Sequence, residues 1–383
     1  MSPALAAIAG VAESDLGVTD KSPLQLNAQA VRRALDDAGL ELQDVDGLAT
    51  TGLSRFSATQ LGEYLGLQPV WTDSTMAGGS SFDLFVARAA EAIRDGLCEL
   101  AVVSYGSNQR SARSRRLEGV VEPGMPTNDF ELPYAPLRPM SLYAMAARRH
   151  MHEFGTTSEQ LAEIAIAARA WALLNPVAFM HGAGPLAIDD VLDSPVLSSP
   201  LHRLDCCLQT DGGGAVVLTS VEQARALRTR PVVVLGHGEA STNMGSMSIP
   251  DLTATGAYVS GPRALGMAGV DLQDVDVVEV YDSFTITTLL TLEGLGFCGR
   301  GDGGPFVEDG KLRPGGALPL NTMGGGLSYC HPGMFGIFLV IEAVRQLRGE
   351  AGERQVRDAE LALCHGTGGE LSTHATVVLG VDR

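Results

Sequence analysis

One phrase of sequence occurs twice, and this repeat constrains the fold more than any other feature. Ala34-Leu35, Ala38-Gly39 and Leu42-Gln43-Asp44-Val45-Asp46 return at one constant offset as Ala264-Leu265, Ala268-Gly269 and Leu272-Gln273-Asp274-Val275-Asp276. Apolar residues at helical spacing precede the glycine, and a short strand-like run follows the aspartate. The repeat therefore predicts a helix–turn–strand unit that is present in two related α/β halves.

A second pair of segments points the same way. Ala92 to Gly96, followed by Leu100 to Val103, is similar to Ala343 to Gly349, followed by Leu361 to Leu363. Both pairs predict a helix that leads into a buried strand. Chance similarity in a composition rich in alanine and valine is the alternative for either repeat. We place the two halves at residues 1–225 and 226–383, with a loop and helical insertion at about 110–200 in the first half.

Size and charge exclude several classes of protein. A chain of 383 residues can bury a sizeable core, and its net charge of −18 disfavours binding to nucleic acid or to an anionic membrane surface. The six cysteines contain no CxxC pair, and the apolar N-terminal run fits neither a signal peptide nor a membrane span. These features predict a reduced, cytoplasmic protein, and no metal site follows from the sequence.

Glycine is unusually abundant, and it concentrates in a few turns. The 46 glycines are about 12% of the chain, against a usual share of about 7%. Glycine runs of this kind mark tight turns or a close approach of the backbone to another group. Four glycine-rich or polar turns lie beside apolar runs: Met76–Ser81, Tyr281–Phe284, Gly324–Met334 and Cys364–Gly369. These turns are the places where chemistry is expected.

The order of these turns across two repeated halves resembles the thiolase superfamily, and most closely its sterol-carrier-type, lipid-transfer branch. The phrases that carry the resemblance are Val280–Thr285, Leu292–Cys298, Asn321–Ser328, His331–Gly333 and Glu342–Gly349. The resemblance covers the whole chain. It implies a thiolase fold, in which two related halves with mixed β-sheets form a layered αβαβα arrangement. It also implies a homodimer that binds an acyl-CoA.

The nucleophilic cysteine of thiolases is missing from this chain. The family places it just before a small-residue turn at the start of a buried helix, where the helix N-terminus favours the thiolate. Depending on the register, that position falls here on Met76 or on Ala77, and neither side chain can attack a carbonyl. Ser80 and Ser81 are possible substitutes, but no base lies beside them in the sequence. Serines at helix starts are more often caps.

The resemblance also suggests where catalytic groups lie. The second turn reads Tyr281-Asp282-Ser283-Phe284, where sterol-carrier-type thiolases have His-Asp-Cys-Phe. Tyr281 is either an acid–base group that needs support for its phenolate or a core tyrosine. Asp282 is expected to order the turn rather than to react. His331 matches the family's Gly-His-Pro histidine, which implies oxyanion stabilisation, with a structural histidine as the alternative. Tyr329 is either a pocket residue that assists Tyr281 or a packing aromatic.

Further residues are weaker candidates. Cys364 lies near the second thiolase cysteine, and His365 near a histidine of the sterol-carrier type, so either is a possible acid–base group in an uncertain register. The glycines expected near the CoA and oxyanion region are Gly324, Gly325, Gly326, Gly368 and Gly369. A short basic run is a candidate for contact with CoA phosphates or an acidic protein surface, or is a solvated loop: Arg110, Arg113, Arg115 and Arg116.

Loss of the nucleophile with retention of the oxyanion turn indicates a particular reaction. Claisen cleavage needs an acyl-enzyme, whereas retro-aldol cleavage of a β-hydroxyacyl-CoA needs only a base and a site for the enolate. The chain thus resembles thiolase-like aldolases of steroid side-chain degradation. That resemblance implies a small zinc-ribbon partner with an oligonucleotide-binding-type (OB) fold, commonly in a heterotetramer. Any zinc is expected in the partner, and no cofactor is expected in this chain.

Two other functions stay open at the level of sequence. The chain is alternatively a thiolase or acyltransferase that uses Cys330 or Cys364 as its nucleophile. It is otherwise a noncatalytic subunit that binds acyl-CoA or sterol and has kept the fold after losing catalysis.

Overall fold

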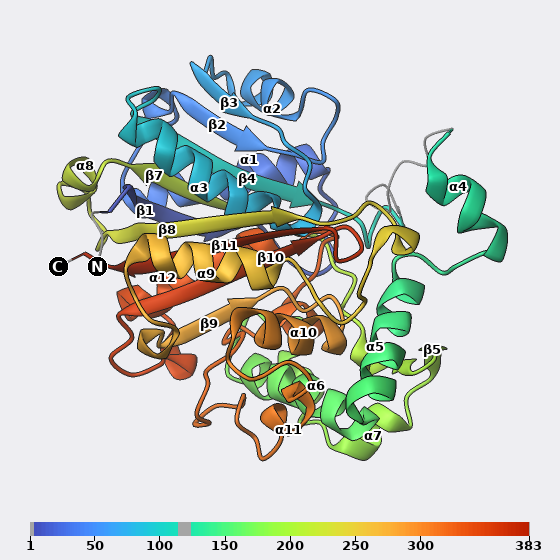
Figure 1. Ribbon diagram of the computed structural model, residues 1–383. Coiled ribbons are helices and arrows are strands. Elements are labelled where there is room, and N and C mark those ends of the chain that lie inside the picture. Colours follow the sequence, from blue (N-terminus) through green and yellow to red (C-terminus); the bar gives the residue numbers. More distant parts are fainter. Residues whose placement is uncertain (1–3, 114–123, 383) are drawn as a thin grey trace.

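The computed structural model describes residues 4–113 and 124–382 (Figure 1). The first half contains β1 (Ala6–Glu13), α1 (Pro23–Ala38), β2 (Gly47–Thr50), α2 (Ser57–Leu65), β3 (Trp71–Asp73), α3 (Ser81–Arg94), β4 (Leu100–Ser107), β7 (Gly212–Thr219) and α8 (Val221–Arg225). The second half contains β8 (Val232–Ser241), α9 (Ala257–Ala268), β9 (Val277–Val280), α10 (Thr285–Leu295), α11 (Gly303–Val307), the π-helical turn η8 (Gly325–Tyr329), α12 (Gly336–Arg348), β10 (Leu361–Gly368) and β11 (Thr373–Val381).

The repeated phrase folds as predicted in both halves. Helices α1 and α9 end at glycines in the left-handed conformation, Gly39 and Gly269, and each is followed by a 3₁₀ turn and a buried strand. The last aspartate of the phrase has the same structural role in both halves. Asp46 accepts N–H bonds from Leu100 and the residue before it, while Asp276 accepts from Leu361 and the residue before it. Each aspartate therefore fixes the start of the next strand.

The strands run in the order β3-β2-β4-β7-β1-β8-β11-β10-β9. The two halves mirror one another, since β2-β4-β7-β1 corresponds to β9-β10-β11-β8. We expected two sheets, but a short antiparallel ladder between β1 and β8 joins them into one. Helix α3 contacts both β4 and β11, which would lie about 19 Å apart in a flat sheet at roughly 4.8 Å per strand. The sheet must therefore curl around the central helices.

Three hydrophobic cores correspond to the layers of the expected arrangement. The central core holds α3 and α12 against strands of both halves, through residues such as Phe85, Phe338, Val216 and Val377. A second core packs α1 on the outer face of the first half. A third packs α9 and α10 on the outer face of the second half. The fold is thus α/β with a large mixed sheet and helices inside and outside it.

The insertion of the first half packs on the second half. Its elements are α4 (Pro126–Phe130), α5 (Met140–Phe154), α6 (Ser158–Leu173), α7 (Ile188–Leu192), β5 (Val196–Ser198) and β6 (Leu201–His202). Helices α5 and α6 contact α10, and α6 also contacts η8 (Figure 1). No helix in residues 4–113 and 124–382 is long and apolar enough to cross a membrane.

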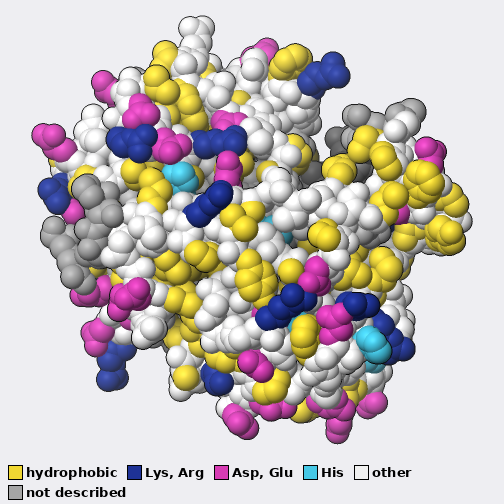
Figure 2. Space-filling view, viewed as in Figure 1, with side chains coloured by type: hydrophobic (Ala, Val, Ile, Leu, Met, Phe, Trp, Pro, Cys, Tyr) yellow, Lys and Arg dark blue, Asp and Glu magenta, His cyan; other side chains and the backbone are white. Residues whose placement is uncertain are grey.

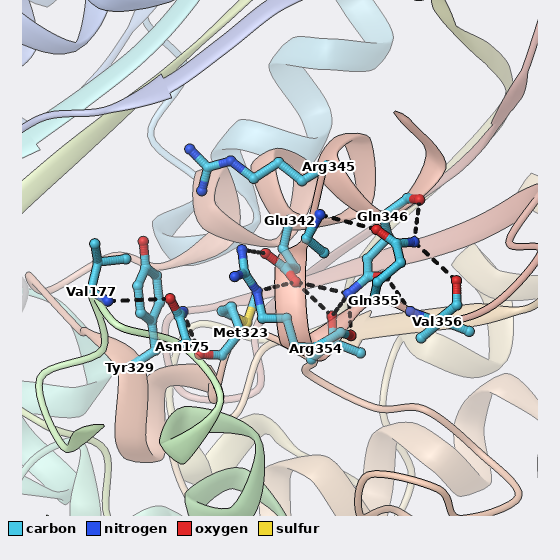
Figure 3. A network of polar contacts seen from close by, with 12 residues as sticks. Asn175, Val177, Met323, Tyr329, Glu342, Arg345, Gln346, Arg354, Gln355 and Val356 are labelled. Carbon is cyan, nitrogen blue, oxygen red and sulfur yellow. Dashed lines mark hydrogen bonds and ion pairs between the residues drawn. The ribbon is translucent and has the colours of Figure 1, made fainter. Parts of the chain in front are cut away.

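A buried polar network supports the turn that leads into η8 (Figure 3). Glu342 on α12 accepts two bonds from the Arg354 guanidinium, at 2.9 and 3.0 Å, and one from the Thr322 hydroxyl at 2.8 Å. From the insertion, the Asn175 amide donates to the carbonyl of Met323 at 2.9 Å. The segment from Thr322 to η8 is therefore held by α12 on one side and by the insertion on the other.

Candidate active site

The predicted turns meet around one cavity of about 490 Å³. Residues of all four turns line it, together with the start of α5 and the loop before β7. The lining residues include Met76, Ala77, Arg138, Tyr143, Cys206, Cys207, Tyr281, Ser283, His331, Glu370 and Thr373. Its size lies in the usual range for small-molecule sites, about 300–1,000 Å³.

Tyr281 and His331 form a hydrogen-bonded pair on the cavity wall. The Tyr281 hydroxyl lies 2.8 Å from Nε2 of His331. Tyr281 directly follows β9, and its N–H donates to the carbonyl of His365 at 2.9 Å, while the N–H of His331 donates to the Thr210 hydroxyl at 3.0 Å. The ring of Phe335 stacks on His331. Two residues separated by 50 positions are thus held rigidly at proton-transfer distance.

Burial keeps both members of this pair uncharged. Desolvation raises the pKa of Tyr281 well above its usual value near 10, and it lowers the pKa of His331 to about 4. In one tautomer of His331 the phenol donates to the imidazole, so the phenol oxygen is free to accept a proton. In the other tautomer the imidazole donates, and the phenol O–H is free to hold an oxyanion. The pair can therefore take up or release one proton without a stable phenolate.

Gly79 makes room for the tyrosine ring. A Cβ at Gly79 would lie 2.0 Å from Cε2 of Tyr281 and 2.5 Å from the carbonyl oxygen of Thr367. No side chain larger than hydrogen fits there without moving the ring. The first-half turn thus shapes the site of the second half.

Asp282 orders a turn, as expected. Its carboxylate accepts the N–H of Gly326 at 2.6 Å and that of Leu327 at 3.2 Å, which ties the end of β9 to η8. Burial raises the pKa of Asp282 to about 7, although these two N–H bonds favour the charged form. π-Helical turns are rare and often occur at functional sites. The carboxylate therefore fixes η8, whose last residue lies two positions before His331.

Most of the glycines expected at the CoA and oxyanion region serve the turns instead. The N–H of Gly324 donates to Asn321, that of Gly325 faces the Met323 sulfur, and that of Gly326 is bound to Asp282. A Cβ at Gly368 would lie 1.9 Å from the carbonyl oxygen of Ala77, so this residue permits close packing of two turns. Of the five, Gly369 lines the cavity. Gly78, Gly79 and Gly333 also line it.

Tyr329 does not lie beside Tyr281. Its hydroxyl donates to Glu13 at 2.8 Å, and Glu13 is paired with both terminal nitrogens of Arg345. The ring packs edge-on against Phe338 in the central core, and Tyr329 is absent from the cavity wall. The expected support of the phenolate by Tyr329 is therefore not what the geometry offers, since its hydroxyl is occupied elsewhere.

Three sulfur and imidazole candidates also lie outside the cavity. Cys330 and Cys364 are fully buried in the central core, and the Cys364 thiol donates weakly to the carbonyl of Leu339. His365 faces the opposite side of β10, where its ring nitrogens contact Thr376 at 2.8 Å and His374 at 3.3 Å. Alternation along the strand separates Cys364 from His365, and neither reaches a ligand in the cavity.

The turn at the thiolase nucleophile position carries no nucleophile. Met76 and Ala77 both line the cavity. Ser81 accepts the N–H of Ala77 at 2.9 Å, and Ser80 donates to the carbonyl of Ala77 at 2.7 Å and contacts Thr373. The two serines therefore stabilise the turn before α3, although neither makes the N-cap hydrogen bond to the first turn of the helix that was expected.

Several cavity residues were not predicted from the sequence. Tyr143 on α5 packs against Phe284 with ring centroids 4.4 Å apart, and its hydroxyl donates to Gly369. Arg138 and Glu370, paired at 2.6 Å, are the two charged residues on the described cavity wall. A loop and a helix of the insertion supply Arg138 and Tyr143. No local pattern marks such residues, because only the packing of the insertion on the second half brings them here.

Two arginines of the basic run, Arg110 and Arg113, are described by the structure, and neither lines the cavity. The Arg110 guanidinium donates to the carbonyl of Gln209 at 2.9 Å and lies over the Phe179 ring, and Arg113 is exposed. Arg115 and Arg116 fall outside the described residues. Arg138 is thus the cation of the described cavity.

Comparison with known proteins places the chain among thiolase-like lyases. Residues 238–381 match the thiolase C-terminal domain-like family. A 17-hydroxy-3-oxo-4-pregnene-20-carboxyl-CoA lyase of Mycobacterium tuberculosis is 36% identical over 90% of this chain and 92% of that protein. A steroid side-chain-cleaving aldolase of Thermomonospora curvata is 35% identical over 100% of this chain and 99% of that protein. The solved Ltp2-ChsH2(DUF35) aldolase superposes with a TM-score of 0.89 at 33% identity, covering 99% of this chain and 98% of that chain.

Thiolases proper are also similar to this chain. An acetyl-CoA acetyltransferase of Methanothermobacter thermautotrophicus is 33% identical over 96% of this chain and 98% of that protein. Human mitochondrial 3-ketoacyl-CoA thiolase has the same fold, with a TM-score of 0.70 at 15% identity over 100% of both chains. Because acyltransferases share this fold, the residues of the site are needed to explain how a lyase reaction is carried out on it.

Proposed function

This chain belongs to the thiolase superfamily, and from that premise we propose that it is a carbon–carbon lyase that cleaves a β-hydroxyacyl-CoA by a retro-aldol reaction. The products are a ketone and a shortened acyl-CoA. The observation that carries this proposal is the combination on one cavity wall of a Tyr281–His331 pair with Met76 and Ala77. The cavity thus contains a proton acceptor, while the position at which thiolases have their nucleophilic cysteine carries no nucleophile.

The reaction begins at the hydroxyl group of the substrate. The Tyr281 oxygen takes the carbinol proton as its own proton moves to Nε2 of His331, so no free phenolate forms. The bond between the carbinol carbon and the α-carbon then breaks, and its electrons move into the thioester as an enolate. The enolate oxygen requires hydrogen-bond donors from the cavity wall, each of which typically contributes about 3 kcal/mol to transition-state stabilisation. Free CoA takes no part.

An acyltransferase reaction has less support from the site. It requires a thiol that forms an acyl-enzyme, and the two cysteines considered for that role, Cys330 and Cys364, are fully buried outside the cavity. Burial raises the pKa of both thiols well above the usual value, and it does the same for Cys207, which does line the cavity, so the nucleophilic thiolate is disfavoured at all three positions. The acetyltransferase relative keeps this alternative worth testing. A noncatalytic binding subunit would not need a proton-transfer pair at 2.8 Å.

We propose a steroid or a similar bulky ring system as the ketone half of the substrate. One relative that spans this whole chain is named a steroid side-chain-cleaving aldolase, and another that spans 90% of it is named a lyase of a 17-hydroxy-3-oxo-4-pregnene-20-carboxyl-CoA. The cavity wall suits such a ligand, because it combines apolar residues such as Met140, Phe284 and Met334 with few polar groups. Arg138, held by Glu370, is the natural contact for an anionic or carbonyl group of the substrate.

We also propose that the chain works with a second, small polypeptide of the zinc-ribbon and OB-fold type, in a heterotetramer built on a homodimer. The support is the superposed Ltp2-ChsH2(DUF35) aldolase, whose name joins two components. A suitable surface also exists, since exposed apolar side chains gather over α4 and the segment after it (Figure 2): Phe130, Tyr134 and Leu137. Zinc, if present, would belong to the partner. A cytoplasmic location stays a prediction.

The test is product analysis with and without the partner. The protein, alone and co-expressed with a small zinc-ribbon protein, is incubated with a tertiary β-hydroxyacyl-CoA that carries a ring system, without free CoA. Mass spectrometry should show a ketone and an acyl-CoA. In a parallel incubation with added, isotopically labelled free CoA, the label should not enter the acyl-CoA product. A requirement for added CoA, or incorporation of the label, would identify an acyltransferase. Full activity of the chain alone would remove the need for a partner.

A further inference from the structure

Two of the six cysteines lie on the cavity wall, and they differ in their surroundings. The thiol of Cys206 donates to the carbonyl of His202 at 3.2 Å, so its proton is engaged. Cys207, the next residue, lines the same cavity as Tyr281 and His331. The remaining four cysteines are absent from the wall. Cys207 therefore has access to a bound substrate and has no role in the proton uptake described above.

The backbone fixes Cys207 between the two catalytic turns. Its N–H donates to the carbonyl of Ser283, at 2.9 Å, two residues after Tyr281. The next residue, Leu208, donates to the carbonyl of Gly326 at 2.9 Å. Thr210 exchanges two bonds with His331, at 3.2 and 3.0 Å. The segment from Cys206 to Thr210 is thus tied along both turns, and the thiol has a set position relative to the reacting pair.

The proposed reaction leaves one proton transfer without a donor. Tyr281 and His331 collect the proton of the carbinol oxygen, but the enolate must be protonated at its α-carbon. Two other hydroxyls of the wall are engaged, since Ser283 is paired with Thr287 at 3.0 Å and Tyr143 donates to Gly369. The buried Thr367 hydroxyl has no hydrogen-bond partner among the described residues, but an aliphatic hydroxyl is a much weaker acid than a thiol. We propose that Cys207 is a catalytic residue that delivers the proton to the α-carbon of the enolate. This inference rests on the retro-aldol function proposed above.

The proton cycle closes without any other reactant. The S–H bond of Cys207 breaks as the C–H bond at the α-carbon forms, and the enolate electrons supply that bond. The resulting thiolate then recovers a proton from the Tyr281–His331 pair, so the net result of one turnover is the loss of one proton from the carbinol oxygen and the gain of one at the α-carbon. Burial raises the pKa of the Cys207 thiol, and a Cys207 thiolate would in turn raise the pKa of Tyr281. The Cys207 thiolate therefore opposes ionisation of Tyr281, and it is discharged when it takes a proton from the pair.

The test follows the stereochemistry of the new C–H bond. The substrate is a β-hydroxyacyl-CoA with one methyl group on the α-carbon, cleaved in deuterium oxide, so the acyl product carries one deuterium at a new stereocentre. The parent protein should give a single configuration. Cys207→Ala should lower kcat by about 10²-fold or more, the usual size for loss of a general acid, and should give both configurations because solvent protonates the enolate.

Two variants serve as controls for structure. Cys206→Ala removes the neighbouring thiol of the same wall and should keep both the rate and the single configuration. Cys207→Ser keeps the shape with a weaker acid, and should give an intermediate rate with a single configuration.

The outcomes separate this inference from the proposed function. Cleavage by Cys207→Ala at the parent rate with a single configuration would overturn the role of Cys207 and leave the retro-aldol function intact. If Cys207→Ala no longer binds acyl-CoA, the configuration of the product from Cys207→Ser becomes the deciding measurement. A mixture of configurations from folded Cys207→Ser would also overturn the role. No cleavage by the parent protein, with or without a partner, would instead refute the proposed function itself.

Discussion

The two halves of the molecule share one architecture and divide the site unequally between them. Asp46 and Asp276 fix the same strand starts in the two halves, and α3 and α12 lie in the same central layer. Yet the first-half turn presents Met76, Ala77 and Gly79 to the cavity, whereas the second half presents Tyr281 and His331. The first-half turn thus supplies space, and the second half supplies the pair that takes up the carbinol proton. A repeated fold preserves the positions of turns without preserving their chemistry.

The sharpest test of this division is Tyr281→Phe. The change removes the hydroxyl that lies 2.8 Å from His331 and keeps the ring against Gly79 and Phe335. We expect kcat to fall by about 10³-fold or more with folding and acyl-CoA binding retained, because the change removes the oxygen that takes the carbinol proton and passes a proton to His331. Steady-state kinetics with a binding assay measure this. Cleavage at the parent rate would show that the second half does not supply the base.

Gly79→Ala tests whether the first-half turn contributes only the space that the Tyr281 ring occupies. The added methyl would lie 2.0 Å from the Tyr281 ring, so the ring must move away from His331. We expect kcat to fall by about 10²-fold, and the free energy of unfolding to fall by roughly 1–3 kcal/mol through overpacking. Met76→Ala is the matched control, because this side chain is half exposed on the same turn, and it should change kcat little. Equal losses of kcat in Gly79→Ala and Met76→Ala would show that the first-half turn does not act by making room for the Tyr281 ring.

The pH dependence of kcat/KM distinguishes two groups of the second half. The pKa of Asp282 is raised to about 7, and its charged form accepts the two N–H bonds that hold η8. Activity should therefore fall severalfold, to at most about tenfold, from pH 7 to pH 6, and Asp282→Asn should move the acid limb toward the pKa of His331, about 4. An acid limb near pH 7 that persists in Asp282→Asn would assign it to another group.

Acid unfolding through Asp282 would not mimic this result. A carboxyl whose folded pKa exceeds its unfolded value near 4 stabilises the fold in acid, and this contribution is lost as the pH rises from about 4 to about 7. His331 acts in the opposite direction, because its folded pKa lies below the unfolded value near 6.5. Its contribution is full above that value and is lost as the pH falls toward about 4. Thermal melts at each pH separate the two effects from catalysis.

The smallest effect is expected for the buried cysteines. Cys330→Ala and Cys364→Ala, singly and together, alter the central core outside the cavity. We expect kcat to stay within about threefold of the parent value, with a loss of roughly 1 kcal/mol in the free energy of unfolding for each change. A loss of about 10³-fold in a folded variant would return the chain to the acyltransferase class.

Local patterns in the sequence predicted the units of the fold better than the composition of the site. The Leu-Gln-Asp-Val-Asp phrase predicted both helix–turn–strand units, because its capping and periodicity act over a few residues. The missing nucleophile at Met76 or Ala77 was equally visible. By contrast, Tyr143 and Arg138 reach the cavity only because the insertion of the first half packs on the second, which no local pattern encodes.

The sequence by itself predicted two related α/β halves, the absence of the thiolase-type nucleophile, and a tyrosine at the position where the sterol-carrier-type pattern that the chain resembles has a histidine. Only the tertiary structure decided which candidates share a cavity. Tyr281 meets His331, while Tyr329 turns to Glu13 and His365 to His374. The physical reason is that strand alternation and helix packing select the face on which each side chain emerges. Groups within one short segment, such as Tyr329 and His331, therefore point to different environments.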